Sequence, residues 1–255
     1  AETQPVMMNP AVTFTPEAFV ASASFLKAEK KFTSLVPTQL SRLAIAAQHD
    51  ESVLRALKTF DAILVGGQST APALLQQLRE HGVNVVETYG SAETFGGVVY
   101  DGTPLACAES SIANDSRIEI HSETLALGIG ETFLTNDLGE LVDGKLQVLG
   151  RADRVIISGG IKVSLDRVET IAREVAGVVE MVAAPIQDQE WGQRVGVLYL
   201  GSPEVADEIA TQLADLLGPA AKPLRVIRVD RVPKLDSGKY DLLAAAAIFA
   251  KERND

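Results

Sequence analysis

GRADRVIISGG, residues 150–160, is the stretch of sequence that most restricts the fold of this chain. It sets Arg151 beside a glycine and ends in a pair of glycines. Far along the chain, the run SGK at residues 237–239 again combines a cation with a glycine. Backbone N–H groups exposed by glycine and a nearby positive charge together suit a phosphate-bearing ligand. Because the two runs are far apart in sequence, they predict one site shared by two mobile parts of the chain.

The length and composition exclude several classes of protein. The chain has 255 residues, of which 46% are apolar, enough for one large domain or two smaller ones with a sizeable core. A net charge of −11 disfavours a nucleic-acid partner, because such a partner requires a wide basic surface. Cys107 is the only cysteine, so the sequence holds no internal disulfide and fits a reducing compartment.

Membrane insertion is also disfavoured by the sequence. No run approaches the roughly 20 apolar residues of a membrane-spanning helix. The N-terminus shows no basic segment followed by an apolar one, as a secretion signal would. We therefore expect a soluble, cytoplasmic protein without a membrane span, and the sequence leaves open whether it forms a homo-oligomer.

The first part of the chain alternates strands and helices. Helices are expected at residues 15–30, 38–47, 51–59 and 71–81, and strands at 32–36, 62–65 and 83–87. Two of these strands end in glycine-containing pairs, Gly66-Gly67 and Tyr89-Gly90. This rhythm predicts an α/β layer with a mainly parallel sheet, in which ligands bind at the carboxyl ends of the strands.

The pattern changes after Val98. Short alternating runs at 117–121 and 145–149, separated by Gly, Asn and Asp, predict antiparallel strands on one flank. After Asp153 the chain restarts, with helices expected at 165–176, 203–217 and 240–253 and strands at 178–185, 195–200 and 225–229. The predicted fold class is α/β, with a large domain over residues 1–152 and a small α+β domain over residues 153–255.

The ends of the strands carry candidate binding residues. Gly66 and Gly67, followed by Gln68, let the backbone approach a flat ring or a phosphate closely, although alone they are typical of an ordinary tight turn. In the run YGSAET at residues 89–94, Tyr89 could stack on a base. Glu93 could hold Mg²⁺, a hard cation that prefers carboxylate and phosphate oxygens, but an exposed glutamate at a strand end is the competing interpretation.

These motifs resemble those of the acyl-adenylate-forming enzymes, a family of ATP-dependent acyl-CoA ligases, when they are taken together with TNDLGE at residues 135–140. The resemblance at residue 150 continues as far as Val168 and Glu169, a span over which coincidence is improbable. It implies a large domain and a small mobile domain that bind ATP or AMP, Mg²⁺, coenzyme A and a small-molecule carboxylic acid.

The resemblance assigns roles within the nucleotide site. Residues expected to contact the nucleotide are Gly66, Gly67, Gln68, Tyr89, Gly90, Ser91, Asp137 and Arg151. Glu93 would hold Mg²⁺, and Asp137 would accept hydrogen bonds from both ribose hydroxyls.

The resemblance also assigns roles to residues of the small domain. Asp153 would be the hinge, a position that must absorb a large change in φ and ψ. Lys239 would be the catalytic cation that bridges the acid and the α-phosphate, whereas an isolated Ser-Gly-Lys would be a solvated lysine after a turn. Gly159 and Gly160 would let the pantetheine arm of CoA pass close to the backbone.

Some positions depart from the family pattern. Ala92 stands where the family has a hydroxyl for the α-phosphate, and Ser91 and Thr94 are the neighbours that could replace it. Asn136 replaces a glycine in an expected turn, and Leu242 replaces an arginine. Residues 1–34 contain no Ser/Thr/Gly-rich phosphate loop ending in lysine, so we expect a fragment, or a degenerate copy, of a longer ligase.

Within the family, residues 33–40, 96–105 and 151–168 look most like the ligases of o-succinylbenzoate in menaquinone biosynthesis. By this resemblance the acyl pocket is flanked by Val36, Pro37, Thr38, Gly96 and Gly97. Two alternatives stay open: a non-catalytic remnant that still binds a nucleotide or CoA, and a ligase for a fatty or aryl acid.

Overall fold

The computed structural model describes residues 5–8, 13–235 and 239–251, and it divides into two compact units. The first unit consists of the chain up to Ser111 together with residues 119–134 and 141–147. The second consists of residues 112–118 and 135–140 and the chain from Val148 onward. The domain boundary at residues 152 and 153 and the hinge at Asp153 stay predictions.

The first unit contains a five-stranded mixed sheet in sequential order. Its strands are β1 (Phe32–Leu35), β2 (Ala62–Val65), β3 (Val85–Ser91), β4 (Gly96–Tyr100) and β5 (Thr103–Pro104). The pairs β1–β2 and β2–β3 are parallel, whereas β3–β4 and β4–β5 are antiparallel. The predicted parallel sheet is therefore confirmed for its first three strands.

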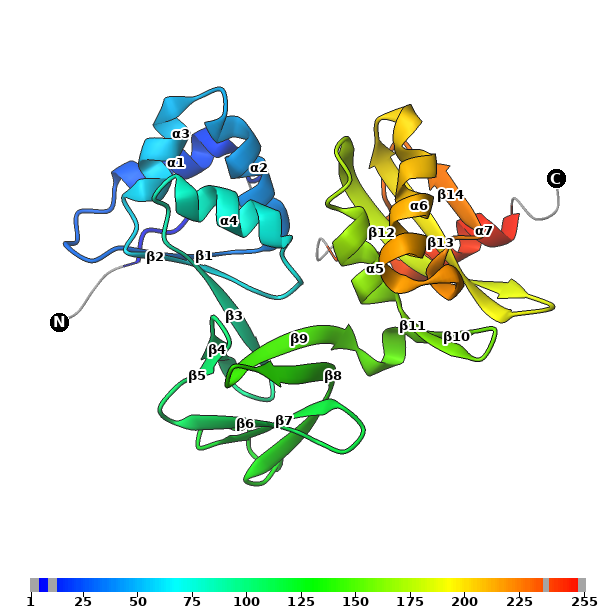
Figure 1. The fold of residues 1–255 in the computed structure, drawn as a ribbon. Coiled ribbons are helices and arrows are strands. Elements are labelled where there is room, and N and C mark those ends of the chain that lie inside the picture. Colours follow the sequence, from blue (N-terminus) through cyan, green and yellow to red (C-terminus); the bar gives the residue numbers. More distant parts are fainter. Residues whose placement is uncertain (1–4, 9–12, 236–238, 252–255) are drawn as a thin grey trace. The chain divides into compact units, whose positions relative to one another are not determined.

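Four helices gather on one side of β1 and β2 (Figure 1). They are α1 (Pro16–Ser24), α2 (Pro37–Ala47), α3 (Glu51–Lys58) and α4 (Pro72–Glu80). Three of them begin with proline, whose fixed φ suits the first helical position. Thr15 caps α1 by accepting the Ala18 N–H, but this helix ends at Ser24 rather than at the expected residue 30. Fully buried Leu40, Leu57 and Ile63 join the helices to the sheet.

A second, four-stranded sheet has the order β6 (Ala108–Ile112), β7 (Arg117–Ser122), β8 (Thr132–Val142) and β9 (Lys145–Arg151). A two-residue turn joins β8 to β9, with φ of 51° at Asp143 and 76° at Gly144. Positive φ at both central positions is the geometry that matches the twist of an antiparallel hairpin. The predicted antiparallel strands at 117–121 and 145–149 are therefore confirmed.

The third sheet lies in the second unit. Its strands are β10 (Val155–Ser158), β11 (Ile161–Ser164), β12 (Val178–Asp188), β13 (Gly192–Gly201) and β14 (Arg225–Arg228). The order is β11-β10-β13-β12, and β14 pairs in parallel with β13. Its helices are α5 (Leu165–Ala172), α6 (Ala206–Leu217) and α7 (Leu242–Lys251), with short 3₁₀ turns at Ala152–Arg154, Pro203–Val205 and Pro219–Ala221.

Both faces of this sheet are buried. Met181 and Ala183 of β12 pack in one core with Val168 of α5 and Ile209 of α6. The intervening residues, such as Val182, pack in a second core with Ala245 and Phe249 of α7. Because successive side chains of a strand point to opposite faces, a strand covered on both sides must be apolar at every position. This accounts for the continuous run MVAAPI at residues 181–186.

Two strands of the structure extend over residues that were not predicted as strand. Tyr89, Gly90 and Ser91 belong to β3, because β3 continues to pair with β4 as far as Ser91 and Gly96, with an irregularity after Tyr89. Residues 135–137 lie inside β8, so the turn expected at Asn136 is wrong. In both cases the partner strand supplies hydrogen bonds that local turn propensity does not reveal.

Gly196 provides a test of the close packing in the second unit. A Cβ built there would lie 2.7 Å from Ile186 Cδ1 and 2.8 Å from Phe249 Cε2. We expect Gly196→Ala to lower the free energy of unfolding by about 1–3 kcal/mol through overpacking. Denaturant unfolding of Gly196→Ala, Ile186→Ala and the double variant measures the coupling between the two positions. Strictly additive losses would contradict the packing described here.

Candidate functional site

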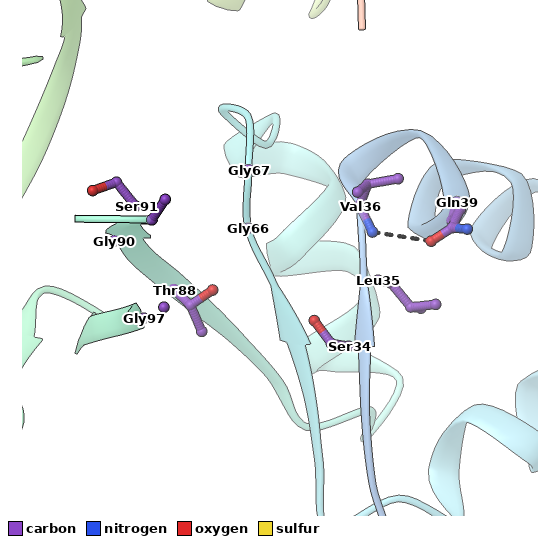
Figure 2. A pocket seen from close by; sticks show the side chains of 12 residues that line it. Ser34, Leu35, Val36, Gln39, Gly66, Gly67, Thr88, Gly90, Ser91 and Gly97 are labelled. Atoms are coloured by element: carbon purple, nitrogen blue, oxygen red, sulfur yellow. Dashed lines mark hydrogen bonds between the residues drawn. The ribbon is translucent and has the colours of Figure 1, made fainter. Parts of the chain in front are cut away.

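A cavity of about 470 Å³ opens at the carboxyl ends of β1, β2 and β3 (Figure 2). The sequence predicted a ligand site at this edge, where parallel strands end together. All of its lining residues belong to the first unit. They are Ser34, Leu35, Val36, Gln39, Gly66, Gly67, Thr88, Gly90, Ser91, Ala92, Gly96 and Gly97.

Glycine is required at two points of this wall. A Cβ at Gly66 would overlap the Thr88 hydroxyl, which donates a hydrogen bond of 3.2 Å to the Val65 carbonyl. A Cβ at Gly90 would overlap the carbonyl oxygen of Gly96. Five of the twelve lining residues are glycines, which let a flat or charged ligand approach the backbone closely.

The cavity unites most, but not all, of the residues predicted for the first unit. Seven of them line it: Val36, Gly66, Gly67, Gly90, Ser91, Gly96 and Gly97. Pro37, Thr38, Gln68, Tyr89 and Glu93 are not among its lining residues. The roles of all these residues stay predictions.

Four lining residues were not predicted as site residues: Ser34, Leu35, Gln39 and Thr88. The Gln39 side-chain oxygen accepts the Val36 N–H at 3.1 Å, as Figure 2 shows, and so fixes the start of α2 at the cavity rim. A proline at the first helical position with glutamine two residues later is a recognisable helix start that could have revealed this contact.

Glu93 is exposed at the tip of the loop between β3 and β4. The neighbouring Ser91 hydroxyl and the Glu93 backbone lower the pKa of its carboxyl, so the group is ionised at neutral pH. The described residues contain no group of three or more His, Cys, Asp or Glu that could hold a metal ion. Mg²⁺ commonly uses one or two carboxylates together with substrate phosphates, and a single ionised carboxylate fits that mode of binding.

Thr94 cannot supply the hydroxyl that Ala92 lacks. Its side chain is only 2% exposed. Its Oγ1 accepts the Ser91 N–H at 2.8 Å and lies 2.7 Å from the Gly96 carbonyl, to which it donates. With this hydroxyl engaged inside the loop, Ser91 is the neighbouring hydroxyl residue that lines the cavity, and its Oγ is buried without a hydrogen-bond partner among the described residues.

Arg151 lies among three carboxylates in the second unit. Its guanidinium donates two hydrogen bonds to Asp153, at 2.8 and 2.7 Å, and lies 3.6 Å from Asp137. Its backbone N–H donates to Asp166 at 2.7 Å. The bidentate contact raises the pKa of Arg151 and lowers that of Asp153. Thus two residues predicted to contact the nucleotide, Asp137 and Arg151, lie together, and the predicted hinge residue Asp153 joins them.

A buried ion-pair network adjoins this cluster and was not predicted. Arg154 contacts Asp166 and Glu169, each at 2.5 Å, and Glu169 also accepts from Arg173 at 2.6 Å. Burial raises the pKa of Asp166, while the nearby Arg154 charge opposes that shift. A Cβ at Gly150 would lie 2.7 Å from the Asp166 side chain. The segment 150–154 is therefore held against α5 through Asp166.

Lys239 is exposed on a tethered segment. Its carbonyl accepts the Leu235 N–H at 2.8 Å, and Lys234 forms an ion pair of 2.8 Å with Glu180. Burial raises the pKa of Tyr240, which lies beneath the cations of Lys234 and Arg173. Ser237 and Gly238 of the predicted motif lie outside the described residues.

Gly159 and Gly160 form the turn between β10 and β11, with φ of 57° and 83°. The Gly159 N–H donates to the Trp191 carbonyl at 2.9 Å. A Cβ at Gly159 would lie 2.7 Å from the Trp191 ring, so the turn lies directly on the indole and admits no side chain at this position. Their predicted role in CoA binding stays a prediction.

Comparison with known proteins reveals the family. Residues 167–239 match the model of the AMP-binding enzyme C-terminal domain. Over 97% of the chain, the sequence is 32% identical to a probable 2-succinylbenzoate–CoA ligase of Mycobacterium tuberculosis, of which it covers 68%. The chain belongs to the adenylate-forming acid–CoA ligase family. A second member, the 2-succinylbenzoate–CoA ligase of Escherichia coli, is 27% identical over 80% of this chain, which spans 47% of its length.

Solved structures agree on the fold. The o-succinylbenzoate CoA synthetase of Bacillus subtilis, solved with an acyl-adenylate intermediate, matches with a TM-score of 0.74 at 23% identity, over 91% of this chain and 54% of that one. The amide bond synthetase of Marinactinospora thermotolerans matches with a TM-score of 0.79 at 21% identity, over 92% and 55%. The predicted α/β fold class, with its adenylate-forming family architecture, is therefore confirmed. None of the helices in the described residues is long and apolar enough to cross a membrane.

The contact between Arg151 and Asp153 predicts a pH effect. The folded-state pKa of Asp153 is lowered, so its ionised form stabilises the fold above about pH 4, and this contribution is lost as pH falls through the folded pKa. We expect Arg151→Ala to raise the pKa of Asp153 and to remove up to about 1 kcal/mol, since both side chains are half exposed. NMR titration measures the pKa, with the exposed Arg167→Ala as the matched control. An Asp153 pKa that does not move would contradict the pairing.

Proposed function

We propose that this chain acts in the ATP-dependent activation of a carboxylic acid for transfer to coenzyme A, and that the acid is o-succinylbenzoate. The observation that carries this proposal is the 32% identity to a probable 2-succinylbenzoate–CoA ligase over nearly the whole chain. The chain spans 68% of that relative and 47% of the Escherichia coli ligase, so the proposal concerns the protein to which these residues contribute.

The proposed reaction has two steps. In the first, an oxygen of the substrate carboxylate attacks the α-phosphorus of ATP, the bond to the β-phosphate breaks, and pyrophosphate leaves. In the second, the thiolate of CoA attacks the acyl carbonyl carbon, and AMP leaves as the thioester forms. Both steps develop negative charge on oxygen, so fixed cations and backbone N–H groups aimed at those atoms lower the barrier.

The first unit would hold the nucleotide and the acid. The cavity walls near Gly66, Gly67 and Gly90 leave room for a base and a phosphate close to the backbone. Gln68 and Tyr89 would add contacts to the base. Val36, Pro37, Thr38, Gly96 and Gly97 would flank the acyl group. Glu93, ionised at neutral pH, would hold Mg²⁺, which would offset phosphate charge when bound.

The second unit would supply the remaining contacts. Asp137 would accept the ribose hydroxyls, with Arg151 beside it at 3.6 Å. Lys239 would bring an ammonium group to the oxygens of the acid and the α-phosphate. Gly159 and Gly160 would border the path of the pantetheine arm, and Asp153 would be the hinge.

A second candidate function is a protein that binds a nucleotide or CoA without catalysis. Ala92 favours it, because the structure shows that the Thr94 hydroxyl is engaged elsewhere and cannot replace the missing group. Leu242 also favours it, since an apolar side chain stands where the family carries an arginine. A third candidate is a ligase for a fatty or aryl acid.

A substrate panel distinguishes these candidates. Pyrophosphate release is measured with o-succinylbenzoate, octanoate and benzoate at equal concentrations, and AMP and ATP binding is measured by calorimetry. We expect kcat/KM for o-succinylbenzoate to exceed the others by at least about tenfold, roughly 1.4 kcal/mol of transition-state binding. A preference for octanoate or benzoate would support the third candidate. AMP binding without turnover would support the second.

Lys239 provides a test of mechanism. We expect Lys239→Ala to slow adenylation by about a hundredfold or more, as loss of a charge-stabilising donor does. Thioester formation from preformed acyl-AMP should change much less, because the α-phosphate is not attacked in that step. Single-turnover kinetics separate the two steps, and Lys251→Ala, another exposed lysine of the second unit, is the matched control. Equal losses in both steps would refute the assigned role.

A further inference from the structure

We propose that Thr94 is a positioning residue whose hydroxyl fixes the loop that carries Glu93 at the rim of the cavity. The effect of Thr94 on catalysis rests on the proposed function, whereas its effect on the conformation of the loop does not depend on that function. Thr94 itself does not line the cavity, whereas residues on both sides of it, Ser91 and Gly96, do.

The Thr94 hydroxyl links the two ends of this loop. Oγ1 accepts the N–H of Ser91 at 2.8 Å. It lies 3.1 Å from the Ser91 carbonyl and 2.7 Å from the Gly96 carbonyl, to either of which it can donate. One side chain thus contacts the last residue of β3 and the first residue of β4, and Glu93 lies between them.

A second set of contacts holds the same loop from outside. The Thr124 hydroxyl donates to the Thr94 carbonyl at 3.2 Å, and the Ala126 N–H donates to the Glu93 carbonyl at 2.8 Å. The Thr124 N–H donates to Ser122 Oγ at 3.2 Å, and the Ser122 hydroxyl donates to the Cys107 carbonyl at 3.0 Å. Backbone on both sides of the Glu93 side chain is therefore fixed within the first unit.

The loop has little else to hold it. Ala92, Glu93 and Phe95 are exposed, and Phe95 is 87% exposed. Phe95 also has φ of 60°, a conformation that costs energy for a residue with a Cβ and persists only where surrounding contacts impose it. Thr94, at 2% exposed, is the buried member of the loop, and its hydrogen bonds are directed at the loop backbone.

Substitution of Thr94 by valine and by serine distinguishes the effect of the side chain's shape from the effect of its hydrogen bonds. Thr94→Val keeps the branched side chain and removes the hydroxyl, and Thr94→Ser keeps the hydroxyl and removes the methyl group. Thr59→Val is the matched control, because the Thr59 hydroxyl donates to the Ala56 carbonyl at the end of α3. Thermal unfolding of each variant establishes that it is folded.

The first readout is hydrogen exchange of the Ser91 amide, which needs no ligand. We expect Thr94→Val to speed this exchange about threefold to tenfold, as loss of one hydrogen bond does, with Thr94→Ser close to the unsubstituted chain. Thr59→Val should leave it unchanged. Unchanged exchange in Thr94→Val would overturn the proposal, whether or not the chain is active.

The second readout is the Mg²⁺ concentration that half-saturates ATP-dependent pyrophosphate release. We expect Thr94→Val to raise it severalfold, Thr94→Ser to restore it, and Thr59→Val to leave it unchanged. An unchanged Mg²⁺ dependence in an active Thr94→Val variant would overturn the role in positioning Glu93. If the unsubstituted chain neither binds ATP nor releases pyrophosphate, the proposed function fails, and the exchange experiment alone decides whether Thr94 fixes the loop.

Discussion

The first unit depends on how closely its strands approach one another at their carboxyl ends. Thr88 fills the space that a side chain at Gly66 would need, and Gly96 fills the space beside Gly90. Without glycine at these points β2, β3 and β4 could not keep their present separation, and the cavity between them would change shape. The same constraint accounts for the glycines in the cavity wall, where a ligand can approach the backbone closely.

The second unit depends on a different constraint, the burial of both faces of one sheet. Met181 and Val182 are neighbours in sequence yet lie in separate cores, one closed by α5 and α6 and the other by α7. Against this apolar scaffold, the carboxylates of Asp166 and Glu169 compensate the charges of Arg154 and Arg173. Such a network stabilises only as a complete set, because removing one partner leaves a buried charge unpaired.

Much of the fold could be predicted from the sequence, because hydrophobic periodicity and glycine or proline punctuation are local signals. The strand at residues 62–65 and the glycines after it are an example, and so are the two strands of the β12–β13 hairpin. Features that depend on a partner element were harder to predict. The strand expected at residues 83–87 did not include the continuation of β3 to Ser91, which depends on pairing with β4. The contact of Thr124 with the Thr94 carbonyl and the ion pairs of Arg154 were missed for the same reason, because their partners are distant in sequence. The bonds of the Thr94 hydroxyl to Ser91 and Gly96 are local, but they depend on the shape of the loop, which no motif revealed. The resemblance to the family predicted most of the residues that line the cavity, but it did not predict the contacts of Thr94.

The tether around Lys239 has a mechanical consequence. Lys234 is paired with Glu180 and Tyr240 is partly buried, so the backbone that carries the lysine is anchored on both flanks to β12 and its surroundings. An ammonium group attached in this way moves together with the second unit, whereas one on a free tail would move independently of it. In the proposed mechanism, the position of the Lys239 charge is therefore set by the position of the second unit as a whole.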